Sequence, residues 1–183
     1  MKAWLRSNRV GLVAVAILLP ATVGITFANE WTAYFGQRPS IPVDVAPGDE
    51  GAFAATRWAV EKTERIPATS TEGDEIGLPA GSELVVVSVR VTPGELDSNG
   101  ESPRCLLDLE ELEGGTVTRG WGDALSEPIS FDTADGAESI CTASNTEPYL
   151  LETIFVVPAD AGDELALAVT VVGELPEYLR LRL

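Results

Sequence analysis

The order of hydrophobic and polar residues divides this chain of 183 residues into two parts. Residues 10–28 form an uninterrupted uncharged stretch, which follows Lys2, Arg6 and Arg9 and precedes an acidic chain. At about 1.5 Å per residue a helix of this stretch extends roughly 28 Å, close to the thickness of a bilayer's hydrocarbon core. Basic residues mark the cytoplasmic flank of a span. The pattern therefore predicts a single-pass signal anchor in the cell membrane, with residues 1–9 cytoplasmic and the rest extracytoplasmic.

A cleaved secretory signal peptide is the alternative to this anchor. Such a peptide also has a basic start and an apolar core, and residues 26–28 form a poor cleavage site. The apolar core exceeds the ~7–15 residues usual in a signal peptide, however. Trp31, Tyr34 and Phe35 also stand where an interfacial aromatic belt belongs. We therefore favour a retained anchor.

Beyond the anchor, apolar residues recur with a period of two, as in strands that bury one face. Residues 83–91 carry valine at positions 85, 87, 89 and 91, and the same alternation recurs in 105–109, 165–171 and 179–183. Other strand candidates are 51–56, 57–63, 116–121 and 149–157. Turn residues separate these segments, and we find no amphipathic helix of about 12 residues. This arrangement predicts an all-β fold, an antiparallel immunoglobulin-like β-sandwich of seven or eight strands.

Composition changes between the anchor and the first candidate strand. Residues 29–47 contain Pro39, Pro42 and Pro47 and few large apolar side chains, which predicts an extended stalk. Residues 48–183 are numerous enough for one domain with its own core. We therefore expect a membrane helix, a stalk and one extracytoplasmic β-sandwich domain.

The charge of the chain is concentrated after the anchor. All 29 acidic residues lie from Glu30 onward, against nine basic residues, so this part carries a net charge of −20. Such a field repels phosphate backbones and anionic headgroups, and we predict no binding of nucleic acid. A solvated acidic surface is the favoured explanation, and attraction of cations or a basic partner is the alternative.

Cys105 and Cys141 are the two cysteines, and both lie on the predicted extracytoplasmic side, where disulfides persist. We expect them to pair. Closing a loop of about 37 residues would stabilise the fold by roughly 4 kcal/mol in the chain-entropy model. A redox or metal-binding pair would favour a C-x-x-C spacing, which is absent.

The inventory of reactive side chains is small. The chain has no histidine, which excludes Ser-His-Asp and Cys-His catalysis and removes the commonest metal ligand. Lys62 lies beside Glu61 and Glu64, which should raise its pKa and make it unsuitable as a catalytic base. No phosphate-binding loop or dinucleotide motif occurs. We predict no catalytic residue, cofactor or metal site, and an envelope glycan-acting enzyme with paired carboxylates is the weakest alternative.

Two loops carry several oxygen-bearing side chains of the kind that bind Ca²⁺. Neither has the spacing of a D-x-D-x-D-G ladder, and Asp, Asn and Gly are also the residues that tight turns require. Turns are therefore the favoured interpretation, and a module that binds Ca²⁺ or a small ligand through these loops is the alternative. The loops consist of Asp97, Asn99 and Glu101 around Gly100, and of Asp132, Asp135 and Glu138 around Gly136.

Two tryptophans fall within the predicted domain. Trp58 lies on the inward face of its candidate strand and is expected to pack in the core. Trp121 stands between two glycines with Arg119 beside it, and an exposed tryptophan can anchor a protein partner or stack on a sugar. Trp121 is the candidate partner contact, with core or edge packing as the favoured alternative.

The order of these features resembles a known family. An anchor, a Pro-containing stalk, an aromatic first hairpin, a long valine strand and a late strand ending in Val-Val-Pro resemble the immunoglobulin-like, telokin-like domains of unknown function in exported or membrane-anchored Gram-positive proteins. The resemblance covers residues 48–183 and implies the sandwich fold. That family has no established catalytic residues. We therefore expect a non-catalytic interaction or accessory module of the cell envelope. Its expected partners are the membrane, through residues 10–28, and an unidentified envelope protein.

Overall fold

A computed structural model describes residues 8–96 and 99–183 of the chain. These residues fall into two compact units, one up to Arg38 and one from Pro39 to Leu183. Asp97 of the first acidic loop lies outside the described residues.

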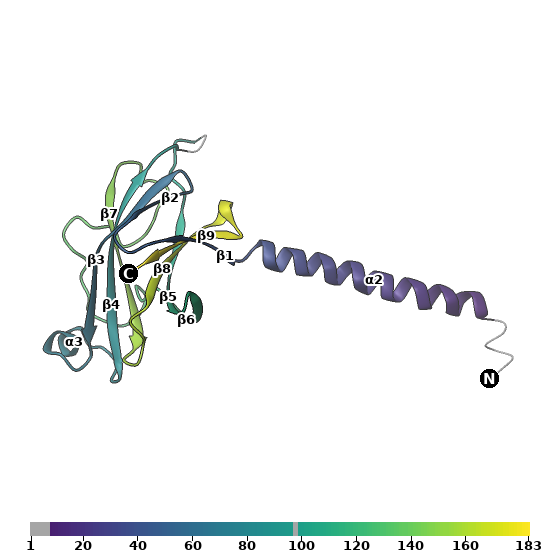
Figure 1. The fold of residues 1–183 in the computed structure, drawn as a ribbon, viewed down its shortest axis with the longest axis horizontal. Coiled ribbons are helices and arrows are strands. Elements are labelled where there is room, and N and C mark those ends of the chain that lie inside the picture. The colour runs from purple at the N-terminus through teal and green to yellow at the C-terminus, as the bar shows by residue number, and fades with distance from the viewer. Residues whose placement is uncertain (1–7, 97–98) are drawn as a thin grey trace. The chain divides into compact units, whose positions relative to one another are not determined.

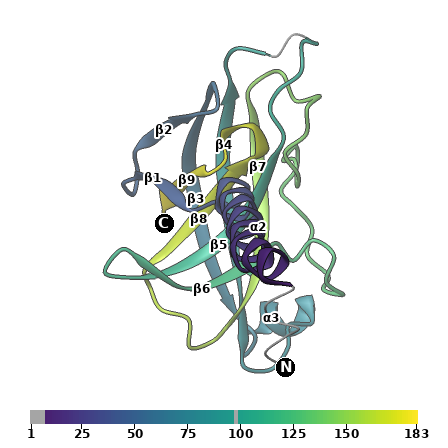
Figure 2. The same cartoon turned by 90° about the vertical axis from the view of Figure 1, so that its right-hand side faces the viewer.

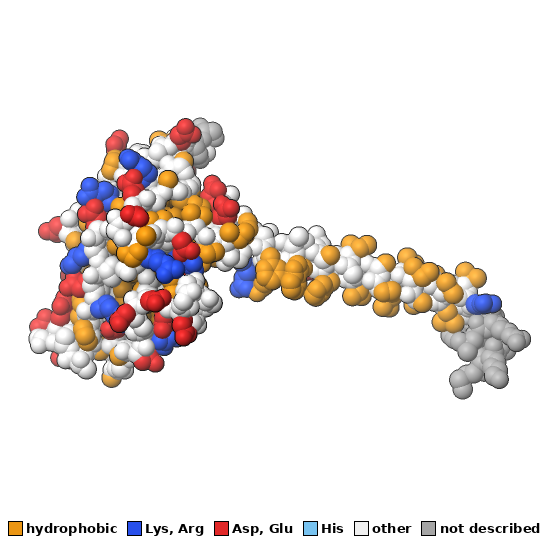
Figure 3. All heavy atoms as spheres, in the orientation of Figure 1, with side chains coloured by type: hydrophobic (Ala, Val, Ile, Leu, Met, Phe, Trp, Pro, Cys, Tyr) orange, Lys and Arg blue, Asp and Glu red, His pale blue; other side chains and the backbone are white. Residues whose placement is uncertain are grey.

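The first unit is the apolar helix α2, Arg9–Gly36, which is long and apolar enough to cross a membrane. None of its side chains is buried within the structure, and apolar side chains line it in Figure 3. The aromatic residues predicted for the interface lie on the last turns of the helix. The Trp31 ring centre is 5.8 Å from that of Phe27 and 4.6 Å from that of Phe35. The helix therefore continues about two turns beyond the predicted span.

The second unit consists almost entirely of strands. Its short helical elements are α3, Thr71–Ile76, and the 3₁₀ turn η1, Val172–Glu174. The described residues form nine strands: β1 Ile41–Val45, β2 Glu50–Phe53, β3 Thr56–Pro67, β4 Ser82–Pro93, β5 Cys105–Glu113, β6 Thr116–Gly122, β7 Tyr149–Pro158, β8 Leu165–Val171 and β9 Glu177–Arg182.

The strands form two sheets that pack face to face. The five-stranded sheet has the order β1-β9-β8-β5-β6, and the four-stranded sheet has the order β2-β3-β4-β7. Figures 1 and 2 show the two sheets from perpendicular directions. Neighbouring strands are antiparallel except β1 and β9, which are parallel. The predicted antiparallel β-sandwich is confirmed, but the described residues form nine strands where seven or eight were predicted, because β1 lies in the predicted stalk.

The core lies between the sheets and follows the period-two pattern. The alternate valines of β4, from Val85 to Val91, are at most 2% exposed, and Trp58 of β3 is 1% exposed. Trp58 donates a hydrogen bond from Nε1 to the carbonyl oxygen of Phe53 at 3.2 Å, so its polar group is paired. Alternate residues of β5, β7, β8 and β9 fill the core from both sheets. The predicted inward positions of β4 and β5 are therefore correct.

Most residues of the expected stalk, 29–47, belong to regular elements in this structure. Residues 29–36 continue α2, and residues 41–45 form the edge strand β1. Proline is tolerated there because an edge strand leaves one side of its backbone unpaired, and Pro42 lies opposite Tyr178. The compact domain therefore begins at Pro39, nine residues before the predicted boundary at residue 48.

The short helix α3 was not predicted. Ser70 caps its first turn by accepting a hydrogen bond from the backbone N–H of Gly73, and Gly77 ends it with a φ of 82°. A Cβ at Gly73 would lie 2.2 Å from the carbonyl oxygen of Pro67. Only glycine fits this close approach, which holds α3 against the end of β3.

Candidate functional site

The two cysteines form a disulfide, as predicted. Cys105 begins β5, and Cys141 lies in the long connection between β6 and β7, with 5.4 Å between their Cα atoms. The bond fastens this connection to the beginning of β5. The disulfide therefore lies at the side of the sandwich where β5 of one sheet and the connection to β7 of the other sheet meet.

Trp121 lies on β6 opposite Leu109 of β5. Its side chain is partly buried and packs against the core between the sheets. The guanidinium carbon of Arg119 lies 5.5 Å from the Trp121 ring centre. The favoured interpretation, packing at the sheet edge, agrees with this geometry, whereas a role in partner contact stays a prediction.

Within the described part of the chain, no three or more His, Cys, Asp or Glu side chains lie close enough together to hold a metal ion. Asp97 of the first acidic loop lies outside this part, so Ca²⁺ binding by that loop stays a prediction. In the second loop, Glu138 joins its loop to β7 through its backbone. Its N–H donates to the carbonyl oxygen of Leu150, and its carbonyl oxygen accepts from the N–H of Glu152, each at 2.8 Å. The backbone N–H of Ala137 also donates to the carbonyl oxygen of Ala134 at 2.9 Å, so the second loop contains the turn that its residues favour.

Lys62 is positioned as its sequence neighbours predict. It is exposed on β3 and forms an ion pair with Glu64, which raises the pKa of its amine. The other neighbour, Glu61, pairs instead with Arg90 at 2.7 Å. An exposed and fully protonated lysine has neither the depressed pKa nor the enclosure that a catalytic base needs.

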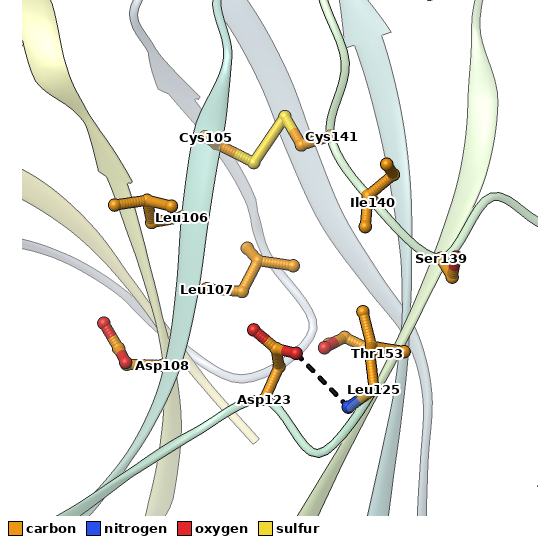
Figure 4. A pocket seen from close by; sticks show the side chains of 10 residues that line it. All are labelled: Cys105, Leu106, Leu107, Asp108, Asp123, Leu125, Ser139, Ile140, Cys141 and Thr153. Atoms are coloured by element: carbon orange, nitrogen blue, oxygen red, sulfur yellow. Dashed lines mark hydrogen bonds between the residues drawn. A yellow bond between two sulfur atoms is a disulfide. The ribbon is translucent and has the colours of Figure 1, made fainter. Parts of the chain in front are cut away.

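A pocket of about 250 Å³ opens beside the disulfide. β5 pairs with β6 only from Asp108 onward, so its first three residues extend past β6 toward this pocket. Figure 4 shows the side chains from β5, from β7 and from the connection between β6 and β7. The lining consists of Cys105, Leu106, Leu107, Asp108, Asp123, Leu125, Ser139, Ile140, Cys141 and Thr153.

Two carboxylates give the pocket its charge. Asp108 faces Gly122 across the β5–β6 ladder, and a methyl group at Gly122 would lie 3.9 Å from Oδ1 of Asp108. The carboxylate therefore lies beside the residue that precedes Asp123. Partial burial of the carboxyl group raises the pKa of Asp108, and the negative charge of Asp123 raises it further. In Figure 4 Asp123 points into the pocket, whereas Asp108 is turned toward the outer side of β5.

The inner end of the pocket carries a hydroxyl group. Thr153 lies opposite Val87 on the inner face of the four-stranded sheet and is 0% exposed. Its Oγ1 has no hydrogen-bond partner among the described residues. In Figure 4 this oxygen faces the carboxylate of Asp123. A buried hydroxyl without a partner costs free energy, so its position here requires an explanation.

None of Asp108, Asp123 and Thr153 was selected as a site residue from the sequence. The sequence contained one sign of this pocket: Leu106 is apolar at an outward position of β5, and the other outward residues of that strand are acidic. Its side chain is 63% exposed beside the pocket. The three polar residues belong to separate segments, and only their positions in the folded chain bring them to one pocket.

Comparisons with known proteins identify no family. No family model matches the chain, and no curated protein matches it. A search of solved structures finds a proposed lipoprotein, ycdA, of Bacillus subtilis, with 14% identity and a TM-score of 0.45 over 73% of this chain and 38% of that chain. It also finds an uncharacterized β-sandwich protein of Clostridium difficile 630, with 10% identity and a TM-score of 0.38 over 80% and 95% of the two chains. A third is a proposed lipoprotein of Staphylococcus aureus, with 8% identity and a TM-score of 0.38 over 72% and 90%. The chain spans well under half of the B. subtilis protein, and no activity is transferred from any of the three.

Proposed function

We propose that this protein is a non-catalytic, membrane-anchored interaction module whose sandwich domain lies outside the cytoplasm. The proposal rests on one observation: the same chain contains the apolar helix α2 and a separate compact domain. The helix is apolar along its length, and none of its side chains is buried within the structure. Exposed apolar side chains on this scale require a nonaqueous environment, which a bilayer supplies.

The domain is suited to binding rather than to catalysis. A glycosidase needs one carboxylic acid and one carboxylate facing each other across a sugar. Here Asp123 is turned inward and Asp108 outward, and Oδ1 of Asp123 also accepts the backbone N–H of Leu125 at 3.3 Å. The walls between the two acids are mainly aliphatic and offer few hydrogen-bond partners for sugar hydroxyls. This arrangement supports a contact site.

Cysteine labelling tests the anchor and its orientation. The native cysteines are joined in the disulfide, so a new cysteine is the only thiol available to a maleimide. In intact cells a membrane-impermeant maleimide should label Ala52→Cys in the domain and should leave Asn8→Cys unlabelled until the membrane is permeabilised. Labelling of Asn8→Cys in intact cells, or protection of Ala52→Cys, would contradict the proposed topology.

Photo-crosslinking in living cells tests the interaction. A photoreactive residue at Ile140, which lines the pocket and is 53% exposed, should yield a discrete adduct with an envelope protein. Val117 is also an exposed apolar residue, at 41%, but it lies opposite Leu112 at the other end of β5 from Cys105, so it provides the matched control position. Equal adducts at both positions, or none at Ile140 across growth conditions, would count against an interaction module that uses this surface.

A further inference from the structure

The pocket beside the disulfide combines apolar walls with negative charge. Leu106, Leu125 and Ile140 are large apolar side chains that remain exposed, by 63%, 36% and 53%. The carboxylate of Asp123 points into the pocket on the side of Leu125 and Ile140, whereas Leu106 lies on the outer side of β5. Such a surface complements a group that has an aliphatic stem and a positively charged end, as lysine and arginine side chains do.

Thr153 adds an observation that is independent of the acids. Its hydroxyl oxygen is buried, unpartnered and directed toward the pocket. The hydroxyl is an acceptor as well as a donor, whereas ammonium and guanidinium groups are donors only. A cation that enters between Asp123 and Thr153 would therefore satisfy both oxygens. A second carboxylate would instead be repelled by Asp123.

We propose that this pocket binds the side chain of a lysine or arginine residue on a partner protein. The charged end lies against Asp123 and the hydroxyl of Thr153, Asp108 adds attraction at the entrance, and the methylene stem covers Leu106 and Ile140. This assignment rests on the proposed function, since it gives the interaction module the chemistry of its contact.

The exposed apolar side chains around the pocket indicate that the cation belongs to a polypeptide and is not a free amine. A free alkylamine would fill part of the pocket and leave the exposed apolar side chains at its entrance in water. A residue within a polypeptide brings neighbouring side chains that cover them. The net charge of −20 after the anchor draws basic partners toward the domain over a longer range.

Calorimetric titration of the full chain in zwitterionic phosphatidylcholine nanodiscs tests the ligand class. The probes are acetyl-Leu-Lys-Leu-amide, the same peptide with norleucine in place of lysine, and n-butylammonium. We expect the lysine peptide to bind at least tenfold more tightly than the norleucine peptide, with an affinity that falls as salt is added. We also expect n-butylammonium to bind more weakly than the lysine peptide.

Matched variants locate the binding within the pocket. Asp123→Asn should weaken the lysine peptide at least tenfold, whereas Asp132→Asn removes the same charge from an exposed loop and should leave its affinity within twofold. Thr153→Val keeps the shape of the side chain and removes only the hydroxyl, so it should weaken binding severalfold without lowering the melting temperature. This last variant separates loss of binding from loss of folding.

Three results would overturn the proposal. Equal binding of the lysine and norleucine peptides would show an apolar pocket without charge recognition. Equal losses in Asp123→Asn and Asp132→Asn would show attraction to the domain as a whole. Binding of n-butylammonium as tight as the lysine peptide would make a free amine the ligand. The cysteine-labelling experiment does not depend on this pocket. The proposed membrane topology can therefore fail while the pocket binds lysine, and the pocket can fail while the topology is correct.

Discussion

At the scale of single residues, Arg180 is the clearest case of a charge that needs its partner. Its side chain is 6% exposed on β9, and it forms two hydrogen bonds to the carboxylate of Asp44 on β1, at 2.7 and 2.9 Å. Glu110 lies farther away, at 3.8 Å. Removing the Asp44 charge leaves a buried guanidinium incompletely paired. We predict that Asp44→Asn lowers the free energy of unfolding by about 1–2 kcal/mol at pH 7, because Asp44 itself is half-exposed.

The pH dependence of this effect has a defined direction. Arg180 lowers the pKa of Asp44, so the folded state favours the carboxylate. The stabilisation is present above the unfolded pKa of about 4 and is lost as the pH falls through the lower folded value. Thermal unfolding of the full chain in detergent should show the gap between wild type and Asp44→Asn closing below pH 4. The exposed turn variant Asp49→Asn is the control and should show no such gap.

Asp108 should behave in the opposite way. Burial raises the pKa of its carboxyl group, so the folded state disfavours the charge. Stability is then lost as the pH rises from the unfolded toward the folded pKa, and the penalty persists at neutral pH. We predict that Asp108→Asn raises the melting temperature at pH 7 and adds at most about 1 kcal/mol to the free energy of unfolding, because the carboxyl group is only partly withdrawn from water and solvent screens its charge. A lower melting temperature would show that the carboxylate is needed for folding.

At the scale of elements, strong alternation in sequence was a reliable guide. The valines of β4 and the leucines of β5 occupy the predicted inward positions because a strand places every second side chain on one face. β1 was missed since it is short and contains Pro42, and its pairing with the distant β9 has no local signal. α3 was missed because its few residues depend on capping by Ser70 and on contact with β3.

The candidate site was predictable only in part. The disulfide followed from the number of cysteines and their predicted compartment. Trp121 packs partly against the core from β6, which agrees with the favoured alternative of core or edge packing, whereas its role as a partner contact stays a prediction. The pocket was not predictable, because Leu106, Asp123 and Thr153 meet only when β5, β7 and their connections are folded together. Sequence alternation gives the face of each side chain but not its neighbours on another sheet.

The disulfide is the element-scale feature whose removal should affect both stability and the pocket. Cys105 lies on β5 and Cys141 in the connection that forms the opposite wall. We predict that the double variant Cys105→Ser/Cys141→Ser loses about 2–4 kcal/mol of unfolding free energy. Thermal unfolding with and without reductant checks this. Reductant should destabilise the wild type and should leave the variant unchanged, because the chain has only two cysteines.

At the scale of the whole molecule, the length of α2 fits an anchor that ends in the interface. Its 28 residues extend about 42 Å, whereas the hydrocarbon core measures about 30 Å. The excess lies at the C-terminal end, where the Phe35 ring contacts the rings of Trp31 and Tyr34 and the guanidinium carbon of Arg38 lies 4.4 Å from the Tyr34 ring centre. Tryptophan, tyrosine and arginine are suited to the headgroup region.

Two charges at the middle of the span should therefore release the protein from the membrane. Each arginine at the centre of a membrane helix costs about 2.5–3.5 kcal/mol, while each leucine, isoleucine or valine contributes only about 0.3–0.6 kcal/mol. We predict that Leu18→Arg/Leu19→Arg shifts most of the protein to the soluble fraction after alkaline carbonate extraction. Leu18→Ala/Leu19→Ala should remain in the membrane pellet. If the wild-type protein instead begins after Ala28 and is soluble, the stretch is a cleaved signal peptide, because a retained span of this length and apolarity cannot leave the bilayer.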